Sequence, residues 1–143
     1  MNVKQLSIFL ENRSGRLAEV TEILGKHGVN IRALSLADTS DFGILRVIVN
    51  NPKRACEVLR SEGFTVSETE VMAIEVEDRP GGLASVLKIL SSENINVEYM
   101  YAFLEKFTDH ALIIFRIEAV ERTSALLRTH GIKILSGKEV YDL

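Results

Sequence analysis

A short loop built around an arginine and a glycine occurs twice in the sequence. It runs from Asn12 to Leu17 and again from Asp78 to Leu83, each time between a run of alternating apolar residues and a run with helical spacing. A strand that turns directly into a helix leaves the first N–H groups of the helix without partners, and those groups attract anions. We therefore interpret both loops as candidate binding sites for a small molecule that carries a carboxylate.

The residues in and near the loops could hold both charged ends of a free amino acid. Loop N–H groups and the guanidinium of Arg13 or Arg16 could donate to its carboxylate. The side-chain oxygens of Asn30, Asn96 or Asp78, together with strand carbonyls, could accept from its ammonium. The glycines of the loops have no Cβ, so they let a ligand approach the backbone closely.

Each candidate site also has a purely structural explanation. Asn12 or Asp78 could cap the following helix or shape its turn, and the asparagines at positions 30 and 96 could hold turns at strand edges. The loop arginines could be ordinary solvated charges. Binding is favoured because an asparagine between two apolar residues, at Val29–Ile31 and Ile95–Val97, accompanies the loop in both copies.

The elements that position these loops follow from hydrophobic spacing. Alternating apolar residues predict strands, and apolar residues three and four apart predict amphipathic helices. The first half of the chain gives a strand at 3–10, a helix that ends near residue 26 with Ser14 as its N-cap, strands at 29–37 and 43–49, a helix at 52–62 after a cap at Asn50–Asn51, and a strand that opens at 64–66.

The same order of elements then restarts, with apolar residues that match the first half at a constant offset. The matched sets are Leu6, Ile8, Leu10, Leu17, Val20, Ile23 and Leu24 against Met72, Ile74, Val76, Leu83, Val86, Ile89 and Leu90. The offset grows slightly after the second strand, because the loop at 105–108 is longer. An internal repeat therefore divides the chain into residues 1–69 and 70–143. The segment at 136–143 could extend the last strand.

Each repeat fits the ferredoxin-like βαββαβ arrangement of the α+β class, an antiparallel sheet with two helices on one face. The opposite face is partly apolar as well, because Ile44 and Ile48 flank Arg46, and Leu112 and Ile114 lie on the matching strand. A sheet with one face in water usually alternates more cleanly. We expect both faces to be covered in part, by the other repeat, another subunit or a partner protein; scattered exposed apolar residues are the alternative. The junction at 67–70 has no Pro or Gly, so the repeats should be held close together.

Composition narrows the functional class. The chain has 143 residues, of which 46% are hydrophobic, and a net charge of −3 spread along the sequence. It has no basic run that would predict nucleic-acid binding and no apolar run of the roughly 18 residues that a membrane span needs. The single cysteine, Cys56, cannot form an internal disulfide, which favours a reducing compartment and a cytoplasmic location.

The usual signatures of catalysis and of metal binding are missing from the sequence. His27, His110 and His130 are scattered and have no second ligand at metal spacing, so we expect no metal and no cofactor. No phosphate-binding loop and no nucleophile elbow occurs. Glu75 and Glu77 point the same way along a predicted strand, and nothing around them indicates an acid–base role.

The two βαββαβ repeats, each with an N/D-R-x-G-x-L loop and a later apolar-Asn-apolar strand start, resemble tandem ACT domains over nearly the whole chain. The second loop fits the family's D-R-P-G-x-L pattern better than the first, which has Ser14 where proline is usual. The resemblance implies regulatory modules that bind amino acids or related small metabolites. It also implies two units joined side by side into one extended sheet through their second strands, with ligand between the loop of one unit and the second strand of its neighbour.

Carried over by position, the resemblance implies ligand contacts from Asn12 and Asn30 in the first repeat and from Asp78 and Asn96 in the second. The whole expected ligand-binding set is Leu10, Asn12, Arg13, Ser14, Gly15, Arg16, Leu17, Asn30, Ile31, Val76, Asp78, Arg79, Pro80, Gly81, Gly82, Leu83, Asn96 and Val97.

Two departures bear on the ligand. Leu10 and Val76 stand where serine-binding ACT domains carry a histidine, which argues against serine as the ligand. Asp78 is charged where Asn12 is neutral, so the two sites should differ in affinity.

We therefore expect a non-catalytic, homodimeric protein that senses a free amino acid and biases a partner enzyme or transcription factor. A small enzyme on the same scaffold is the competing class, because a fold does not fix a function. An assembly module without a ligand is a third possibility. A closed cleft with catalytic groups would favour the enzyme, and ligand at loop-to-strand junctions would favour the sensor.

Overall fold

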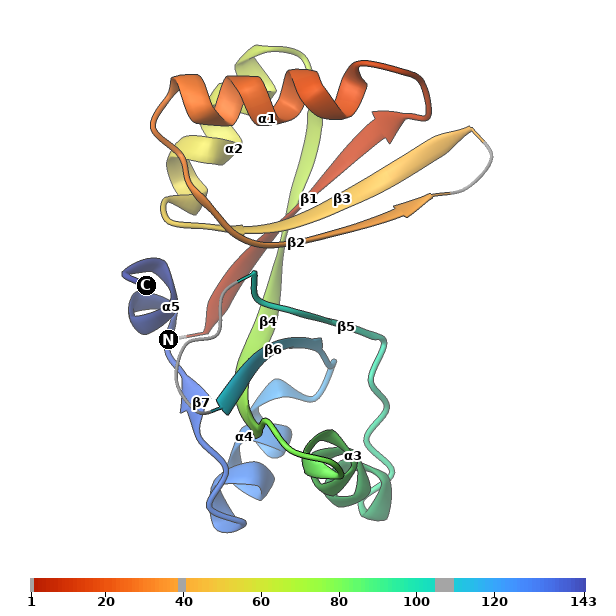
Figure 1. The fold of residues 1–143 in the computed structure, drawn as a ribbon, viewed down its shortest axis with the longest axis vertical. Helices are drawn as coiled ribbons and strands as arrows, with labels where there is room; N and C mark the ends of the chain where they lie inside the picture. Colours follow the sequence, from red (N-terminus) through yellow and green to blue (C-terminus); the bar gives the residue numbers. More distant parts are fainter. Residues whose placement is uncertain (1, 39–40, 105–109) are drawn as a thin grey trace. The chain divides into compact units, whose positions relative to one another are not determined.

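The computed structural model describes residues 2–38, 41–104 and 110–143, which form two compact units (Figure 1). The first unit holds residues 4–69 and 141–143, and the second holds residues 1–3 and 70–140. The repeat boundary between residues 69 and 70 stays a prediction, since each compact unit also takes in a short segment from beyond its own repeat.

The first unit follows the predicted order of strands and helices. Its elements are β1 (Val3–Glu11), α1 (Arg16–Lys26), β2 (Ile31–Asp38), β3 (Phe42–Val49), α2 (Pro52–Ser61) and the beginning of β4 (Thr65–Glu77). The strands are hydrogen-bonded in the order β2-β3-β1-β4, and α1 and α2 cover one face of the sheet (Figure 1). Leu6, Ile8 and Val47 are fully buried on that face. They form a core with Val20 and Leu24 of α1.

The second unit repeats this arrangement. The rest of β4 is followed by α3 (Gly82–Ser92), β5 (Tyr99–Ala102), β6 (His110–Arg116), α4 (Val120–Thr129), β7 (Ile134–Leu135) and α5 (Gly137–Tyr141). The strand order β7-β4-β6-β5 has the same topology as the order in the first unit. Its core contains Met72, Leu90 and Phe115, and full burial of such side chains contributes roughly 1.5–3 kcal/mol each. The predicted α+β class and the duplicated ferredoxin-like topology are thus confirmed.

β4 is a single strand of 13 residues that belongs to both units. The hydrophobic spacing predicted two strands here, the last of the first repeat and the first of the second. Nothing between Ser67 and Glu70 breaks a strand, because the segment has neither glycine nor proline. The two predicted strands therefore run on as one.

Two local expectations are wrong. Ser14 does not cap α1, because Gly15 holds the N-cap position in the left-handed conformation, with φ 91°, and no side chain caps the helix. The segment after β7 forms the short helix α5 and does not extend the strand. Ser136 Oγ accepts from the N–H of Glu139 at 3.2 Å, and Glu139 Oε1 accepts from the N–H of Ser136 at 3.2 Å. This reciprocal capping box starts a helix.

The sheet faces away from the helices are covered at the predicted positions. Ile48, Leu112 and Ile114 are buried, and Ile44 and Arg46 are half-buried. What covers these faces stays a prediction. The longer loop predicted at 105–108 lies outside the described residues, and none of the helices that the structure describes is long and apolar enough to cross a membrane.

The expected pairing between the two second strands is not found. β2 is hydrogen-bonded to β3 and β5 to β6, and both are the last strands of the order described. β2 and β5 are therefore not neighbours of each other in this chain. Each has one hydrogen-bonded strand neighbour, and no other strand of the described residues pairs with its second edge, which we call its open edge.

Candidate functional site

The first loop is a tight turn between β1 and α1. The N–H of Arg13 donates to the carbonyl of Glu11 at 2.8 Å, and the N–H of Arg16 donates to the carbonyl of Arg13 at 3.4 Å. Gly15 is left-handed, and its carbonyl accepts from the N–H of Glu19 at 3.0 Å. The backbone of Asn12 is fixed as well, since its N–H donates to the carbonyl of Asp41 at 2.9 Å.

The second loop has the same backbone hydrogen bonds at matching positions. The N–H of Arg79 donates to the carbonyl of Glu77 at 2.9 Å, and the N–H of Gly82 donates to the carbonyl of Arg79 at 2.9 Å. Gly81 is left-handed with φ 83°, and its carbonyl accepts from the N–H of Ser85 at 3.0 Å. The serine in the first loop and the proline in the second therefore allow the same turn.

Each loop leaves two backbone donors free at the start of its helix. Within the described part of the chain, no hydrogen bond engages the N–H groups of Leu17 and Ala18 or those of Leu83 and Ala84. The aligned peptide dipoles add a partial positive charge at such an end. Both loops therefore present the free backbone donors that an anion site needs, and anion binding at them stays a prediction.

The loop arginines are paired with the carboxylate that ends the preceding strand. Arg13 Nε lies 3.2 Å from Glu11 Oε2, and Arg79 Nε contacts Glu77 Oε2 in the same way. Both arginine side chains are more than half exposed, at 62% and 61%. They could still turn toward a ligand, because exposed ion pairs of this kind contribute little stability.

Arg16 is different, because its guanidinium is held by its own unit. Nη2 lies 3.5 Å from Glu11 Oε1, and Nη1 lies 2.9 Å from Glu19 Oε2. The guanidinium also lies over the ring of Phe64, with Cζ 4.9 Å from the ring centroid. This arginine therefore contributes to the packing of the first unit, and its side chain is only 23% exposed.

The other expected site residues divide by burial. Leu10 and Val76 lie in the cores of their units, and Gly82 is buried against the backbone of Glu77. The remaining exposed members are Asn12, Ser14, Gly15, Leu17, Asn30, Asp78, Pro80, Gly81 and Asn96. The half-buried members are Ile31, Leu83 and Val97, and all three pack against a core.

Loop and asparagine do not meet within one unit. The first loop precedes α1 and Asn30 follows it, so a helix of 11 residues, about 16 Å long, lies between them. The N–H of Asn30 donates to Asn50 Oδ1 at 2.9 Å, which leaves its own side chain at the surface. Asn96 likewise follows α3, where it lines two surface hollows of about 330 and 300 Å³. A single ligand cannot contact the loop and the asparagine of the same unit.

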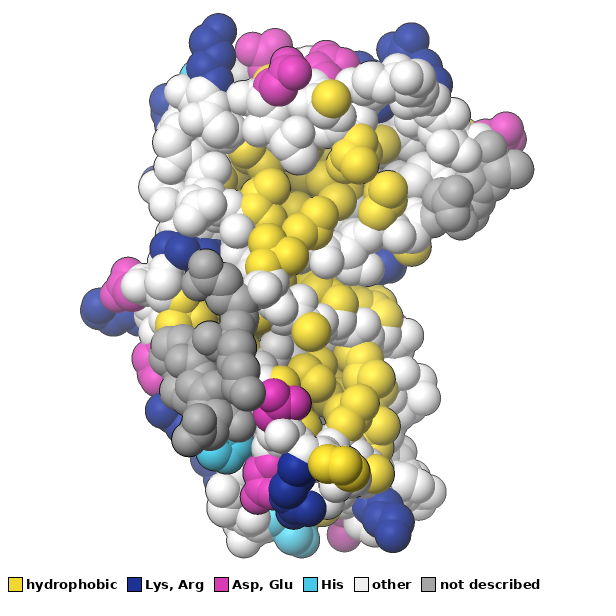
Figure 2. All heavy atoms as spheres, viewed as in Figure 1, with side chains coloured by type: hydrophobic (Ala, Val, Ile, Leu, Met, Phe, Trp, Pro, Cys, Tyr) yellow, Lys and Arg dark blue, Asp and Glu magenta, His cyan; other side chains and the backbone are white. Residues whose placement is uncertain are grey.

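Apolar side chains surround the open edges. Leu17 of α1 is 38% exposed, Leu36 of β2 is 51% exposed, and Met100 of β5 is 40% exposed. Figure 2 shows apolar side chains gathered between α1 and β2 and, in the other unit, between α3 and β5. Exposed apolar surface beside an unpaired strand is typical of a surface that takes up another strand or helix.

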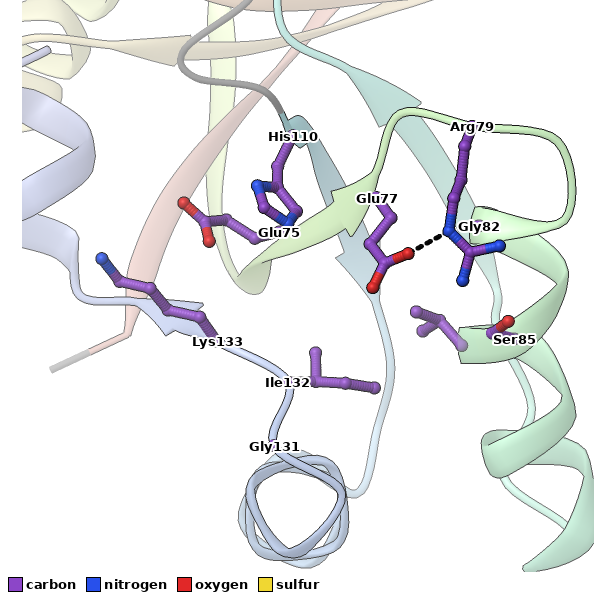
Figure 3. A pocket seen from close by; sticks show the side chains of 10 residues that line it. Glu75, Glu77, Arg79, Gly82, Ser85, His110, Gly131, Ile132 and Lys133 are labelled. Atoms are coloured by element: carbon purple, nitrogen blue, oxygen red, sulfur yellow. Dashed lines mark hydrogen bonds and ion pairs between the residues drawn. The ribbon is translucent and has the colours of Figure 1, made fainter.

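A cavity of about 160 Å³ in the second unit escaped the sequence analysis (Figure 3). Its lining residues are Glu75, Glu77, Arg79, Gly82, Ser85, Val86, His110, Gly131, Ile132 and Lys133. They come from β4, the second loop, α3, β6 and the segment before β7, so no single local motif unites them. The available signal was the change from Arg16 to Gly82 at matching loop positions.

The remaining polar chemistry is modest. Burial raises the pKa of the Cys56 thiol, which fits a small apolar residue inside α2. Across the ranges that the structure describes, no three His, Cys, Asp or Glu side chains gather as metal ligands would.

The sequence model of the ACT domain pair matches residues 1–143. The chain belongs to the ACT domain pair family. This ACT pair is similar over its whole length to the protein BT0572 from Bacteroides thetaiotaomicron, with 42% identity, a TM-score of 0.93 and 98% of that chain covered. No functionally curated protein matches it.

The ACT pair also shares its fold with regulatory subunits of aspartate kinase. The subunit from Thermus thermophilus, in its ligand-free form, is 18% identical with a TM-score of 0.63, and the match covers 92% of each chain. The subunit from Thermus flavus is 15% identical with a TM-score of 0.63, and the match covers 90% of each chain. At these identities the likeness concerns the fold alone.

Proposed function

We propose that this ACT pair is a non-catalytic regulatory protein that binds a free amino acid at its two loops. The observation that carries the proposal is the pair of free N–H groups at the start of each helix, repeated with the same turn geometry in both units. Hydrogen bonds from such groups to a charged carboxylate contribute about 1.5–3 kcal/mol each.

The second loop is the stronger candidate for a zwitterion. The free donors of Leu83 and Ala84 would hold the carboxylate, and the exposed Asp78 would accept from the ammonium. The first loop has the neutral Asn12 at the position of Asp78. We therefore expect the second loop to bind the amino acid more tightly than the first loop does.

A second copy of the chain would complete each site. Loop and asparagine lie at opposite ends of a helix in one unit, so the asparagine at a given site must come from a neighbour. The open edges of β2 and β5, with apolar side chains such as Leu36 and Met100 beside them, offer the surface for that neighbour. Ligand held at such a junction would stabilise the homodimer, and it would bias any enzyme or transcription factor that recognises the dimer.

The fold supports a regulatory role. Two solved proteins that share it are described as regulatory subunits of aspartate kinase. An ACT pair in this role would act on a catalytic partner and would work in the cytoplasm, where free amino acids are abundant.

A thermal-shift screen against the twenty amino acids tests the proposal. At a concentration 100 times its Kd, a ligand adds about 2.7 kcal/mol, which raises Tm by roughly 5–10 °C for a chain of this size. Calorimetry on the best hit then gives the stoichiometry. If no amino acid raises Tm and none gives a heat of binding, the proposal is wrong.

Two pairs of variants locate the site. Asn96→Ala and Asn30→Ala should each weaken amino-acid binding at one of the two kinds of site. Unchanged binding in both variants would exclude these asparagines as ligand contacts. Gly81→Ala strains a left-handed loop residue and should abolish binding at the second loop. Gly63→Ala is the matched control, because Gly63 is also left-handed, with φ 88°, but it follows α2 in the first unit and is not part of the second loop.

A further inference from the structure

The cavity in the second unit is bounded by charged side chains on two sides (Figure 3). Arg79, joined to Glu77, stands on the α3 side, and Lys133 stands on the opposite side. Ile132 gives the cavity an apolar wall. An engineered cavity of about 150 Å³ can hold benzene, so a space of about 160 Å³ is large enough for a small organic group.

The matching place in the first unit is filled by the guanidinium of Arg16. That group contacts Glu11, Glu19 and Phe64. In the repeat register, the counterparts of these three residues are Glu77, Ser85 and Ile132, and all three line the cavity. The counterpart of Arg16 itself is Gly82. The cavity in the second unit thus lies at the place that the Arg16 guanidinium fills in the first unit.

Gly82 cannot be replaced by a residue that fills the space. A Cβ on Gly82 would lie 1.9 Å from the carbonyl oxygen of Glu77, far inside van der Waals contact. The backbone at the start of α3 is closed against β4 at this point, so no side chain from position 82 can enter the cavity.

One carboxylate oxygen is occupied in the first unit and open in the second. Glu11 gives Oε2 to Arg13 and Oε1 to Arg16. Glu77 gives Oε2 to Arg79, and no described residue engages its Oε1. Glu75 also lines the cavity, but its carboxylate lies beside His110 on the Lys133 side and points away from Glu77 (Figure 3). The two cations of the lining have carboxylates of their own, since Lys133 Nζ lies 3.8 Å from Glu139 Oε2 and Arg79 is held by Glu77.

We propose that this cavity binds the guanidinium group of a small molecule. The group would donate to Glu77 Oε1, and its planar face would lie against Ile132, at the place where the guanidinium of Arg16 lies against Phe64 in the first unit. The cavity shares Arg79 and Gly82 with the expected ligand-binding set, but it does not use the N–H groups of Leu83 and Ala84. A probe without a carboxylate therefore tests it apart from the proposed amino-acid site.

Nuclear magnetic resonance with methylguanidinium chloride as the probe tests the proposal on the wild-type chain. We expect saturable shifts of the Gly82, Ser85 and Ile132 amides. Methylurea, a neutral molecule of the same shape, should give none at equal concentration and ionic strength. Shifts that do not saturate, or equal shifts with methylurea, would overturn the proposal.

Charge-removing variants at matching positions sharpen the test. Glu77→Gln should weaken methylguanidinium binding at least tenfold, because it removes the carboxylate and keeps the shape. Glu11→Gln, the counterpart in the first unit, is the control and should leave the affinity unchanged, because Arg16 already fills that place. An unchanged affinity in Glu77→Gln would exclude the carboxylate contact on which the proposal rests.

The first unit offers a converse experiment. Arg16→Gly should open a comparable cavity there and lower Tm, and methylguanidinium should then restore Tm more than methylurea does. Equal effects of the two molecules would count against the proposal. If the variant does not fold, the titration of the wild type and of Glu77→Gln still decides the question.

Discussion

Replacement of Gly82 by alanine places a methyl group where the backbone has no room for it. The new Cβ would lie 1.9 Å from the carbonyl oxygen and 3.0 Å from the carbonyl carbon of Glu77. Ordinary carbon–oxygen contacts lie at about 3.3–3.6 Å, so the start of α3 would have to move by roughly 1.5 Å. The obstacle is backbone, which cannot turn aside as a flexible side chain can.

The expected loss of stability follows from two opposing terms. Overpacking costs about 1–3 kcal/mol, and a clash with backbone belongs in the upper part of that range, at about 2–3 kcal/mol. The better helix propensity of alanine returns at most about 1 kcal/mol. We therefore expect Gly82→Ala to lose about 1–2 kcal/mol, which lowers the urea midpoint by roughly 0.5–1 M for a slope of about 2 kcal/mol/M.

Gly25→Ala is the matched control for this experiment. Gly25 lies in α1, is exposed, and a Cβ there would meet nothing within 4 Å. Alanine should therefore stabilise the protein by about 0.5–1 kcal/mol at this position. Urea unfolding followed by circular dichroism measures both variants. A Gly82→Ala protein as stable as the wild type, or a pair of variants with equal midpoints, would refute the close contact at Glu77.

Three further predictions concern caps and buried groups. Asn51→Ala should cost about 1 kcal/mol in urea unfolding, because Asn51 Oδ1 caps α2 by accepting from the N–H of Arg54 at 3.1 Å. The Ser136 N–H donates to the Glu139 carboxylate and lowers its pKa, so this group stabilises the fold above the ordinary carboxyl pKa and loses that effect as pH falls through the lowered value. Glu139→Gln should therefore make Tm depend less on pH in the acid range. An unchanged dependence of Tm on pH would contradict this. Cys56, buried and with a raised pKa, should resist a thiol reagent at pH 8 until denaturant is added, and rapid labelling of the native protein would contradict its burial.

The repeated topology could be predicted because both periodicities are strong in both halves. Alternation at Leu6, Ile8 and Leu10 and helical spacing at Val20 and Leu24 correspond to residues that the structure buries. The cap at Asn51 was also predictable, since an asparagine before a proline is a common helix start. These signals are local, so neighbouring residues suffice to specify them.

Other features depend on contacts or conformations that local spacing does not encode. Ser14 has the right chemistry for a cap, but Gly15 adopts the left-handed turn at the N-cap position. The start of α5 did have a local signal, because a serine followed three residues later by a glutamate, as at Ser136 and Glu139, is typical of a capping box. The hydrophobic pattern alone favoured a strand there. The cavity could be anticipated only from the contrast between Arg16 and Gly82, because its walls come from parts of the chain that are far apart in sequence.

The assignment of residues 141–143 to the first unit has a consequence for protein synthesis. The hydroxyl of Tyr141 accepts from the N–H of Lys4 at 2.8 Å, and both residues belong to that unit. A ribosome makes residues 4–69 first and reaches Tyr141 only after the whole second repeat has been translated. The first unit therefore cannot form this hydrogen bond while its own residues are being translated. Its folding is complete only after the second repeat has been synthesised.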